Sequence, residues 1–248
     1  MSKESVIEVR DLVCKFGDQT VLDGVSLDVH EGEVLVIMGG SGSGKSTILR
    51  HLIGTYIPDS GHVKIFGEDL AKLDEHGMNK IRRQFGILFQ SGALFNSMSV
   101  ADNVALSLRE HTDLDPDIIS FIVKIKLEQV GLREAADKNP SEISGGMKKR
   151  AGLARALALD PKLLFYDEPS AGLDPVTSAT IDQLILDLAK KAGVTSVVVT
   201  HEMDSAFVIA DRMAMLDKGS MIMVDTREAF EELRDWPIDR VDELDKQQ

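Results

Sequence analysis

The chain of 248 residues is poor in cysteine, in aromatic residues and in positive charge. Its single cysteine, Cys14, cannot form an internal disulfide, which favours a reducing compartment such as the cytoplasm and a place for this residue in the core. Lysine and arginine number 28 against 41 aspartate and glutamate residues, so the formal net charge is −13. This acidity excludes a non-specific nucleic-acid binder, because such proteins need basic surfaces to displace counterions.

Long apolar runs are also missing. The longest strand-like run, Val34–Met38, is far shorter than the ~20 apolar residues that a membrane-spanning helix needs. The first residues show neither a continuous apolar stretch nor a small-residue cleavage site, so we expect no signal peptide. A composition of 43% hydrophobic and 28% charged residues, without repeats or low-complexity segments, is typical of a globular chain.

The hydrophobic pattern predicts an α/β fold. Residues 7–16 and 24–33 alternate apolar and polar side chains, which indicates strands of an antiparallel sheet. The continuous apolar run at 33–38 is typical of a buried parallel strand. Residues 82–158 are mostly helical in pattern, and from Pro161 strands and helices alternate. We therefore expect a parallel α/β core that is split by a helical insertion.

A phosphate-binding motif follows the buried strand directly. The stretch GGSGSGKST fits G-x-x-x-x-G-K-S/T, in which glycines let backbone N–H groups form a concave anion site before a helix. The positive end of that helix favours phosphate, Lys45 adds a cation near the β- and γ-phosphates, and Ser46 offers a hydroxyl to Mg²⁺. The motif predicts binding of ATP with Mg²⁺. Its nine residues are Gly39, Gly40, Ser41, Gly42, Ser43, Gly44, Lys45, Ser46 and Thr47.

Two acids stand at the end of a second apolar run, LLFYDEP. Asp167 is placed to reach Mg²⁺ through water, and Glu168, one residue further, can polarise an attacking water molecule. Alone, the pair could be two surface acids at a strand end. Together with a phosphate-binding motif, it predicts the hydrolytic half of a nucleotide site.

Five motifs occur in one order: GGSGSGKST, ILFQ, ISGGM, LLFYDEP with SAGLDP, and VVVTHE. In this order the chain resembles the ATP-binding cassette (ABC) ATPases over most of its length. The resemblance implies the P-loop NTPase fold of that family, with a RecA-like parallel-sheet core, an N-terminal antiparallel β subdomain and a helical subdomain that carries the signature motif. We expect a single domain over residues 1–248, with a core lobe at 1–88 and 160–225, a helical subdomain at 89–159 and an acidic tail at 226–248.

The resemblance also implies roles for single residues. Gln90 matches the glutamine that touches Mg²⁺ and the lytic water and senses the transmembrane partner. Glu168 matches the general base, His201 the histidine at the γ-phosphate, and Asp174 the loop that communicates between the two sites of a dimer. Phe16 matches the aromatic residue that stacks on adenine, and a core phenylalanine is an equally good interpretation of this residue.

The signature motif is matched by Ser144, Gly145, Gly146 and Met147, where Met147 replaces the usual glutamine. In this family the signature meets the γ-phosphate of ATP bound to a second copy, so the resemblance implies a head-to-tail homodimer that encloses two ATP molecules. A serine hydroxyl, glycine N–H groups and a helix start all favour an anion. The following Lys148–Arg150 could form a nucleic-acid patch, but we expect a solvated helix face.

Longer stretches narrow the resemblance to the ATPases of bacterial Mla-type phospholipid transport systems and their Mce-associated relatives. The most specific features are SGALF after Gln90, and the signature methionine followed by KKR. The resemblance implies a subunit at the cytoplasmic face of the inner membrane, bound to integral membrane permease subunits. A periplasmic Mce-domain lipid-binding protein and a small STAS-domain protein would complete the assembly, which moves glycerophospholipids between inner and outer membranes and maintains outer-membrane lipid asymmetry.

Other functions remain open from the residues alone. The same catalytic residues would serve another importer, for example one for amino acids, because the cargo is chosen by subunits outside this chain. A non-transport cassette acting on ribosomes or DNA is disfavoured by the single cassette, the acidic charge and the lack of a heptad run. Asp225, Arg227 and the final stretch WPIDRVDELDKQQ depart from the family pattern. We expect the acidic tail, residues 226–248, to be a solvated helix.

Overall fold

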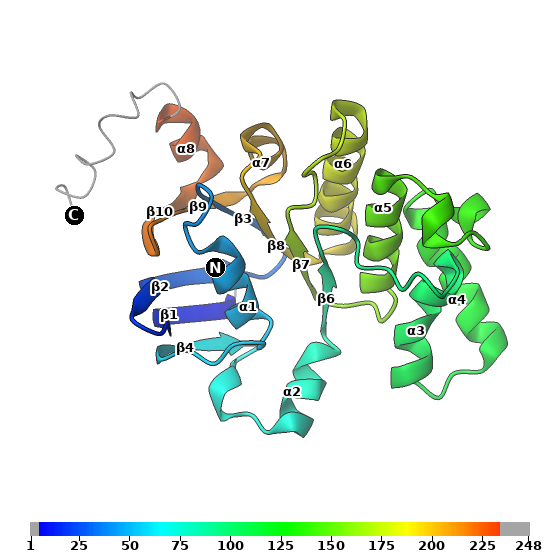
Figure 1. Ribbon diagram of the computed structural model, residues 1–248, viewed down its shortest axis with the longest axis horizontal. Coiled ribbons are helices and arrows are strands. Elements are labelled where there is room, and N and C mark those ends of the chain that lie inside the picture. Colours follow the sequence, from blue (N-terminus) through cyan, green and yellow to red (C-terminus); the bar gives the residue numbers. More distant parts are fainter. Residues whose placement is uncertain (1–4, 234–248) are drawn as a thin grey trace.

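The structure is a computed structural model that describes residues 5–233. Within these residues the chain forms a six-stranded sheet in the order β10-β9-β3-β8-β7-β6 and a four-stranded sheet in the order β2-β1-β4-β5 (Figure 1). The larger sheet consists of β3 (Val34–Met38), β6 (Phe85–Leu88), β7 (Leu163–Asp167), β8 (Thr195–Thr200), β9 (Arg212–Asp217) and β10 (Ser220–Thr226). The smaller sheet consists of β1 (Ser5–Phe16), β2 (Gln19–His30), β4 (Ser60–Ile65) and β5 (Glu68–Asp69).

Helices follow or separate most of these strands. They are α1 (Lys45–Leu52), α2 (Glu75–Arg82), α3 (Val100–His111), α4 (Pro116–Gln129), α5 (Gly145–Ala156), α6 (Pro175–Ala192), α7 (Met203–Ile209) and α8 (Arg227–Leu233), with short 3-10 turns η1 (Leu70–Lys72), η2 (Arg133–Ala135) and η3 (Pro140–Glu142). In Figure 1, α3, α4 and α5 gather at one end of the molecule, away from the small sheet. Over the described residues, no helix combines the length and apolar character needed to cross a bilayer.

The two sheets confirm the predicted combination of a parallel core and an N-terminal antiparallel sheet. Strand β3 pairs in parallel with both β8 and β9, and β7 pairs in parallel with β8 and β6. Consequently β3, β8, β7 and β6 all end at one edge of the large sheet. Strand β1 pairs antiparallel with β2 and β4. Loops that follow the parallel strands therefore converge on one edge of the sheet, where ligands bind in open α/β folds.

Apolar side chains on the two faces of the large sheet enter different core clusters. Strand β3 is buried on both faces, as its continuous apolar sequence predicts. Val34, Val36 and Met38 pack with α5, α6 and α7, whereas Leu35 and Ile37 pack with α1 and the small sheet. Helices α1 and α5 therefore cover opposite faces of the same sheet. Cys14 is buried in the second cluster, as predicted.

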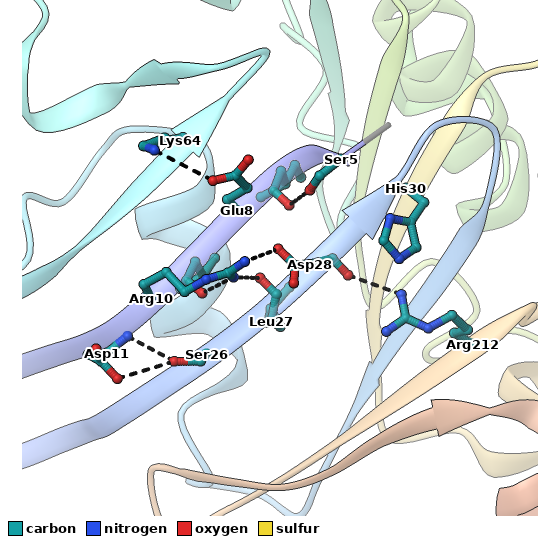
Figure 2. Close-up of polar contacts among 12 residues, drawn as sticks. Ser5, Glu8, Arg10, Asp11, Ser26, Leu27, Asp28, His30, Lys64 and Arg212 are labelled. Carbon is teal, nitrogen blue, oxygen red and sulfur yellow. Dashed lines mark hydrogen bonds and ion pairs between the residues drawn. The ribbon is translucent and has the colours of Figure 1, made fainter. Parts of the chain in front are cut away.

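The small sheet is joined to the large one by polar contacts (Figure 2). Arg10 on β1 and Asp28 on β2 form an ion pair with 2.7 Å between Nη2 and Oδ1. Arg212 on β9 donates to the backbone carbonyl of Asp28 at 3.1 Å and to the carboxylate of Glu33 at 3.0 Å. A strand of the large sheet is thus hydrogen bonded to a strand of the small one, which fixes the small sheet beside β3.

The end of the described chain is not wholly solvated. Helix α8 buries Phe230, which is 5% exposed, against the cluster that contains β3 and α6. The expectation of a solvated helix from 226 onwards is therefore wrong at this residue, because its apolar side chain is part of the core. The rest of the predicted acidic tail lies outside the described residues.

Candidate functional site

The phosphate-binding motif forms a tight turn between β3 and α1, here called the phosphate cradle (Gly39–Thr47). Two of its glycines are required by their surroundings. A Cβ on Gly39 would lie 2.1 Å from the carbonyl oxygen of Leu216, and one on Gly44 would lie 2.8 Å from Cδ2 of Leu22. Gly44 also has a φ of +109°, which L-residues rarely adopt. The cradle therefore keeps its concave backbone because no side chain can replace these two glycines.

The N-terminus of helix α1 lies at the cradle. Its N-cap is Gly44, so no side chain occupies the first N–H groups of the helix. The ammonium of Lys45 donates to the carbonyls of Gly39 at 2.7 Å and Gly40 at 2.9 Å, which holds the cation over the cradle. Ser46 is exposed in the first turn. Of the other cradle residues, Ser41 and Gly42 are exposed, Thr47 is half-buried and Ser43 is buried. Such an opening suits a phosphate group.

The two acids of LLFYDEP lie at the end of β7. Burial raises the pKa of Asp167, and the neighbouring Glu168 raises it further, while Arg50 and Lys45 lower it. Asp167 therefore lies within electrostatic reach of the lysine in the cradle. Glu168 has a φ of +48°, a left-handed conformation that is uncommon for a residue other than glycine. Strain of this kind persists only where contacts fix it, and it occurs often at functional sites.

The Glu168 carboxylate contacts the end of the neighbouring strand β8. His201 Nδ1 lies 2.9 Å from Oε1 of Glu168, and the His201 backbone N–H donates to Oε2 at 3.3 Å. Thr200 Oγ1 donates to the same Oε2 at 3.2 Å. His201 is half exposed and Thr200 is fully buried. The candidate base and the candidate γ-phosphate contact are thus neighbours in space, and Thr200 is a third member that sequence reasoning missed, although it directly precedes His201.

Gln90 and Phe16 are both exposed, Gln90 beside the large sheet and Phe16 on the small one. Gln90 follows β6 and is exposed; β6 ends on the same side of the sheet as β7, where Leu88 pairs with Tyr166. Phe16 ends β1 and is 50% exposed, which excludes the alternative of a core phenylalanine. Its ring meets Tyr56 edge to face at a centroid distance of 5.7 Å. Its predicted stacking on adenine remains a prediction.

The signature residues begin α5, as expected. The Ser144 hydroxyl is the N-cap and accepts from the Met147 N–H at 3.3 Å. Ser144 and Gly145 are exposed, whereas Met147 is partly buried against the core cluster. The replacement of glutamine by methionine thus supplies an apolar contact within this chain. Because α5 and α1 cover opposite faces of the sheet, the signature does not close over the cradle of its own chain.

Asp174 and the signature residue Gly146 both contact Thr177 at the start of α6. The Asp174 carboxylate caps α6 by accepting from the N–H groups of Val176 and Thr177 and from the Thr177 hydroxyl. These hydrogen bonds, that of the Thr177 hydroxyl first, lower the pKa of Asp174. A Cβ on Gly146 would lie 2.4 Å from Cγ2 of Thr177, so only glycine allows this approach. The predicted communication loop is therefore packed directly against the signature helix.

The expected solvated face at Lys148–Arg150 is wrong. Lys149 is 5% exposed, and its ammonium donates to three backbone carbonyls in the segment Glu168–Ala171. Arg150 donates to the carbonyls of Val130 and Gly131 at 2.8 and 3.2 Å. Lys149 is buried and Arg150 is half-buried, and backbone oxygens satisfy both charges. Lys149 was missed as a functional candidate, although Gly146, Lys149 and Leu153 follow one face of a helix.

The residues present fit a magnesium nucleotide. In the part of the chain described, no group of three or more His, Cys, Asp or Glu side chains is arranged to hold a metal ion. Mg²⁺ keeps several waters and takes one or two carboxylates together with phosphate oxygens, so the single carboxylate of Asp167 near the cradle lysine suits it. Ser46, Asp167 and Gln90 would supply its protein contacts, and the concave cradle would take the phosphates.

Comparison with known proteins decides the family. A sequence profile described as ABC transporter matches residues 22–171. The chain belongs to the ABC transporter family. This ABC ATPase is 42% identical over 235 residues to the intermembrane phospholipid transport system ATP-binding protein MlaF of Haemophilus influenzae, covering 95% of this chain and 89% of that protein.

Two further similarities bear on fold and activity. The probable ribonucleotide transport ATP-binding protein mkl of Mycobacterium leprae is 46% identical over 224 residues, which cover 90% of this chain but 65% of that longer protein. The dimeric, post-hydrolysis structure of the ATP-binding cassette MJ0796 bound to ADP and Pi matches with a TM-score of 0.82 and 31% identity, covering 89% of this ABC ATPase and 98% of that chain. The predicted fold and the assignment as an ATPase are confirmed.

Proposed function

We propose that this ABC ATPase energises glycerophospholipid transport between two membranes as an ATP-enclosing homodimer. The observation that carries the dimer is the separation of α1 and α5 on opposite faces of one sheet. An exposed serine N-cap and an exposed glycine at the start of α5 have the chemistry for a phosphate. A second copy related by a two-fold axis would place its α5 over the cradle of the first, and the dimeric state of the similar cassette MJ0796 supports a dimer.

Within such a dimer, different residues of the chain would bind the phosphates and activate the water molecule. Lys45 and the cradle N–H groups hold the phosphates, and Glu168 orients water for attack on the γ-phosphorus and accepts its proton. His201 holds Oε1 of Glu168 and faces the γ-phosphate. Mg²⁺, held by Ser46, Asp167 and Gln90, would neutralise charge on the phosphate oxygens. Asp174 would link the two sites, because its loop contacts the signature helix of its own chain.

A groove beside Gln90 is our candidate docking site for a membrane permease. It has a volume of about 640 Å³ and lies between β6 and the helices α3 and α5. Phe89 and Phe95, 40% and 51% exposed, line it together with Arg82 and Arg155. Exposed aromatic side chains with arginines beside them are typical of protein interfaces. A permease segment seated there would act on β6 and therefore on Gln90.

The cargo and the other partners are inferred from relatives. Similarity to MlaF over 95% of the chain favours phospholipids and a site of action at the cytoplasmic face of the bacterial inner membrane. A periplasmic Mce-domain protein and a small STAS-domain protein are proposed as partners on the resemblance of the motifs SGALF and ISGGMKKR to the Mla-type ATPases. The relative mkl is named as a probable ribonucleotide transport protein, so ribonucleotides are the second candidate cargo. An amino-acid importer is a third, and a non-transport role is disfavoured by the net charge of −13.

Coexpression with integral membrane permease subunits of an Mla-type system tests this proposal. We expect the chain to copurify with that permease from membranes, to carry glycerophospholipid detectable by mass spectrometry, and to hydrolyse ATP faster when phospholipid is added. Phe95→Glu should abolish copurification, whereas Phe121→Glu, a 64% exposed aromatic residue on α4, should preserve it. Stimulation by ribonucleotides or amino acids instead of phospholipid would refute the cargo, and stoichiometric recovery with ribosomes would refute transport.

A further inference from the structure

Lys149 makes an unusual set of contacts for a surface-type residue. Its side chain is almost fully buried on α5, and the ammonium donates to the carbonyls of Glu168 at 3.0 Å, Pro169 at 2.8 Å and Ala171 at 2.8 Å. A lysine ammonium has three donors and no acceptor, so its hydrogen-bonding capacity is completely used by this one loop. Both the burial of the charge and the shape of the loop therefore depend on these three bonds.

The first of the three carbonyls belongs to the residue with the strained backbone. Glu168 has a φ of +48°, and its N–H donates to the carbonyl of Val199 at 2.8 Å. Its carbonyl is the one that Lys149 holds. A non-glycine residue in this region costs on the order of 1–3 kcal/mol and keeps the conformation only when surrounding contacts determine it. Lys149 is such a contact, and the direction of the Glu168 carboxylate depends on this backbone.

The same lysine belongs to the helix that begins with the signature. Ser144 caps α5 and Lys149 lies five residues further, about 7.5 Å along the helix axis at 1.5 Å per residue. A helix is rigid over that length. A displacement of the exposed α5 start is therefore transmitted through Lys149 to the loop that carries Glu168.

We propose that Lys149 is a positioning residue for hydrolysis, which ties the start of α5 to the backbone of Glu168. The inference rests on the proposed function in one respect, namely that Glu168 is the base. In the proposed dimer the α5 start of one copy contacts ATP on the other, so ATP bound at one site would set the carboxylate that acts at the second. Lys149 itself would act only through the loop, because its three donors are all used by backbone carbonyls.

The loop has a second anchor that does not involve α5. The Ser170 hydroxyl lies in a buried cluster with Asp182 on α6 and Ser205 on α7. This cluster holds a side chain of the loop, whereas Lys149 holds its carbonyls. Removing Lys149 should therefore shift the carbonyl geometry of the loop without releasing the whole segment.

The test compares Lys149→Met with Lys149→Arg in the full chain. Lys149→Met keeps the length and removes every donor, and we expect kcat to fall about 10- to 100-fold, the effect of a displacement near 1 Å, with KM for ATP within twofold of the parent. Lys149→Arg keeps the positive charge and the N–H donors and should recover part of the lost kcat, to within about threefold of the parent, as a positioning role requires. Lys148→Met is the matched control and should keep the parent kcat, because Lys148 makes no side-chain hydrogen bond or ion pair among residues 5–233.

Several results would overturn this assignment. They are a kcat of Lys149→Met within twofold of the parent, an equal loss in Lys149→Met and Lys149→Arg, or a KM that rises in proportion to the loss. If Lys149→Met does not fold, as judged by thermal unfolding, Lys149→Gln is measured under the same criteria. Glu168→Gln, measured in parallel, separates the two proposals. Normal turnover of Glu168→Gln would refute Glu168 as the base. If Glu168→Gln is inactive while Lys149→Met keeps the parent kcat, only the positioning role of Lys149 is refuted.

Discussion

His201 holds both oxygens of the Glu168 carboxylate, with its ring Nδ1 2.9 Å from Oε1 and its backbone N–H 3.3 Å from Oε2. The two residues are 33 positions apart in sequence and meet because β7 and β8 are parallel neighbours that end at one edge. A carboxylate held at both oxygens has a defined direction. The ATPase activity is therefore expected to depend on contacts to this carboxylate as well as on its charge.

Glu168→Gln should nearly stop hydrolysis while ATP binding is preserved. The amide keeps the shape of the side chain but cannot accept a proton, and general-base catalysis contributes roughly 10²–10⁴-fold. Phosphate release should fall by that factor, and size-exclusion chromatography with ATP should show a trapped dimer. Glu202→Gln is the control, because Glu202 lies 3.6 Å from His201 Nε2 and is 47% exposed. Equal rates for Glu168→Gln and the parent would show that another group is the base.

Thr200→Val should slow hydrolysis about tenfold without a comparable loss of ATP affinity. It removes the hydroxyl that donates to Glu168 Oε2, and a hydrogen bond to a charged group contributes roughly 1.5–3 kcal/mol. Thr195→Val at the other end of β8 removes an equally buried hydroxyl, which accepts from the Gly32 N–H. Both variants should lose stability in urea unfolding, but Thr195→Val should keep the parent kcat. A parallel loss of kcat in both would attribute the effect to stability alone.

Mixed dimers should show that the site is shared between two copies. A chain with Lys45→Ala combined with one carrying Ser144→Ala leaves one intact site and one site that lacks both groups. We expect such dimers to keep up to half of the parent ATPase activity, whereas each variant alone should be much less active. The heterodimers must first be isolated with two affinity tags. Activity no higher than that of the single-variant dimers would contradict sharing.

Asp182 and Asp187 on α6 should give opposite pH dependences of stability. Burial raises the pKa of Asp182, opposed by hydrogen bonds from Ser205 and Ser170, whereas a hydrogen bond from Lys191 lowers the pKa of Asp187. Because the pKa of Asp182 is raised in the folded state, its carboxyl group stays protonated there at pH values where the unfolded state has already lost the proton. Its contribution to stability therefore falls as pH rises from about 4 through the folded-state pKa. The contribution of Asp187 is present above that pH and is lost as pH falls through its lowered folded-state pKa.

Urea unfolding at pH 2 to 7 measures both effects. Asp182→Asn should reduce the loss of unfolding free energy between pH 4 and 7 relative to the parent. Asp187→Asn should lower stability at pH 7 and leave it nearly unchanged at pH 2, where the carboxyl group is protonated in both states. Identical slopes in the parent and Asp182→Asn would show that this carboxylate does not titrate differently in the two states.

Local signals made much of the site predictable. The cradle, the N-cap at Ser144 and the acids at the end of β7 each follow from a short stretch of sequence with its own turn or capping chemistry. Phe16 could not be decided, because its exposure depends on where β1 ends relative to the large sheet. The cluster of Ser170, Asp182 and Ser205 joins three distant segments and has no local pattern.

Lys149 was mispredicted for a different reason. Three consecutive positive charges favour a solvated face, but the helical phase places the middle one toward the sheet, where backbone carbonyls of a strained loop are available. The phase of α5, read from Gly146 and Leu153, would have indicated burial. The partners of the lysine could not be predicted, because they depend on tertiary structure.

The order of strands in the large sheet has a consequence for synthesis of this protein. Strand β3, which leads into the cradle, pairs with β8 and β9, and both come from residues after 194. A nascent chain that has been synthesised only as far as β7 therefore exposes both edges of the apolar strand VLVIM. The strand that leads into the cradle is paired on both edges only after β9, which ends at Asp217, has left the ribosome. We expect this interval to require chaperones, since long-range parallel pairing is slow and open edges aggregate.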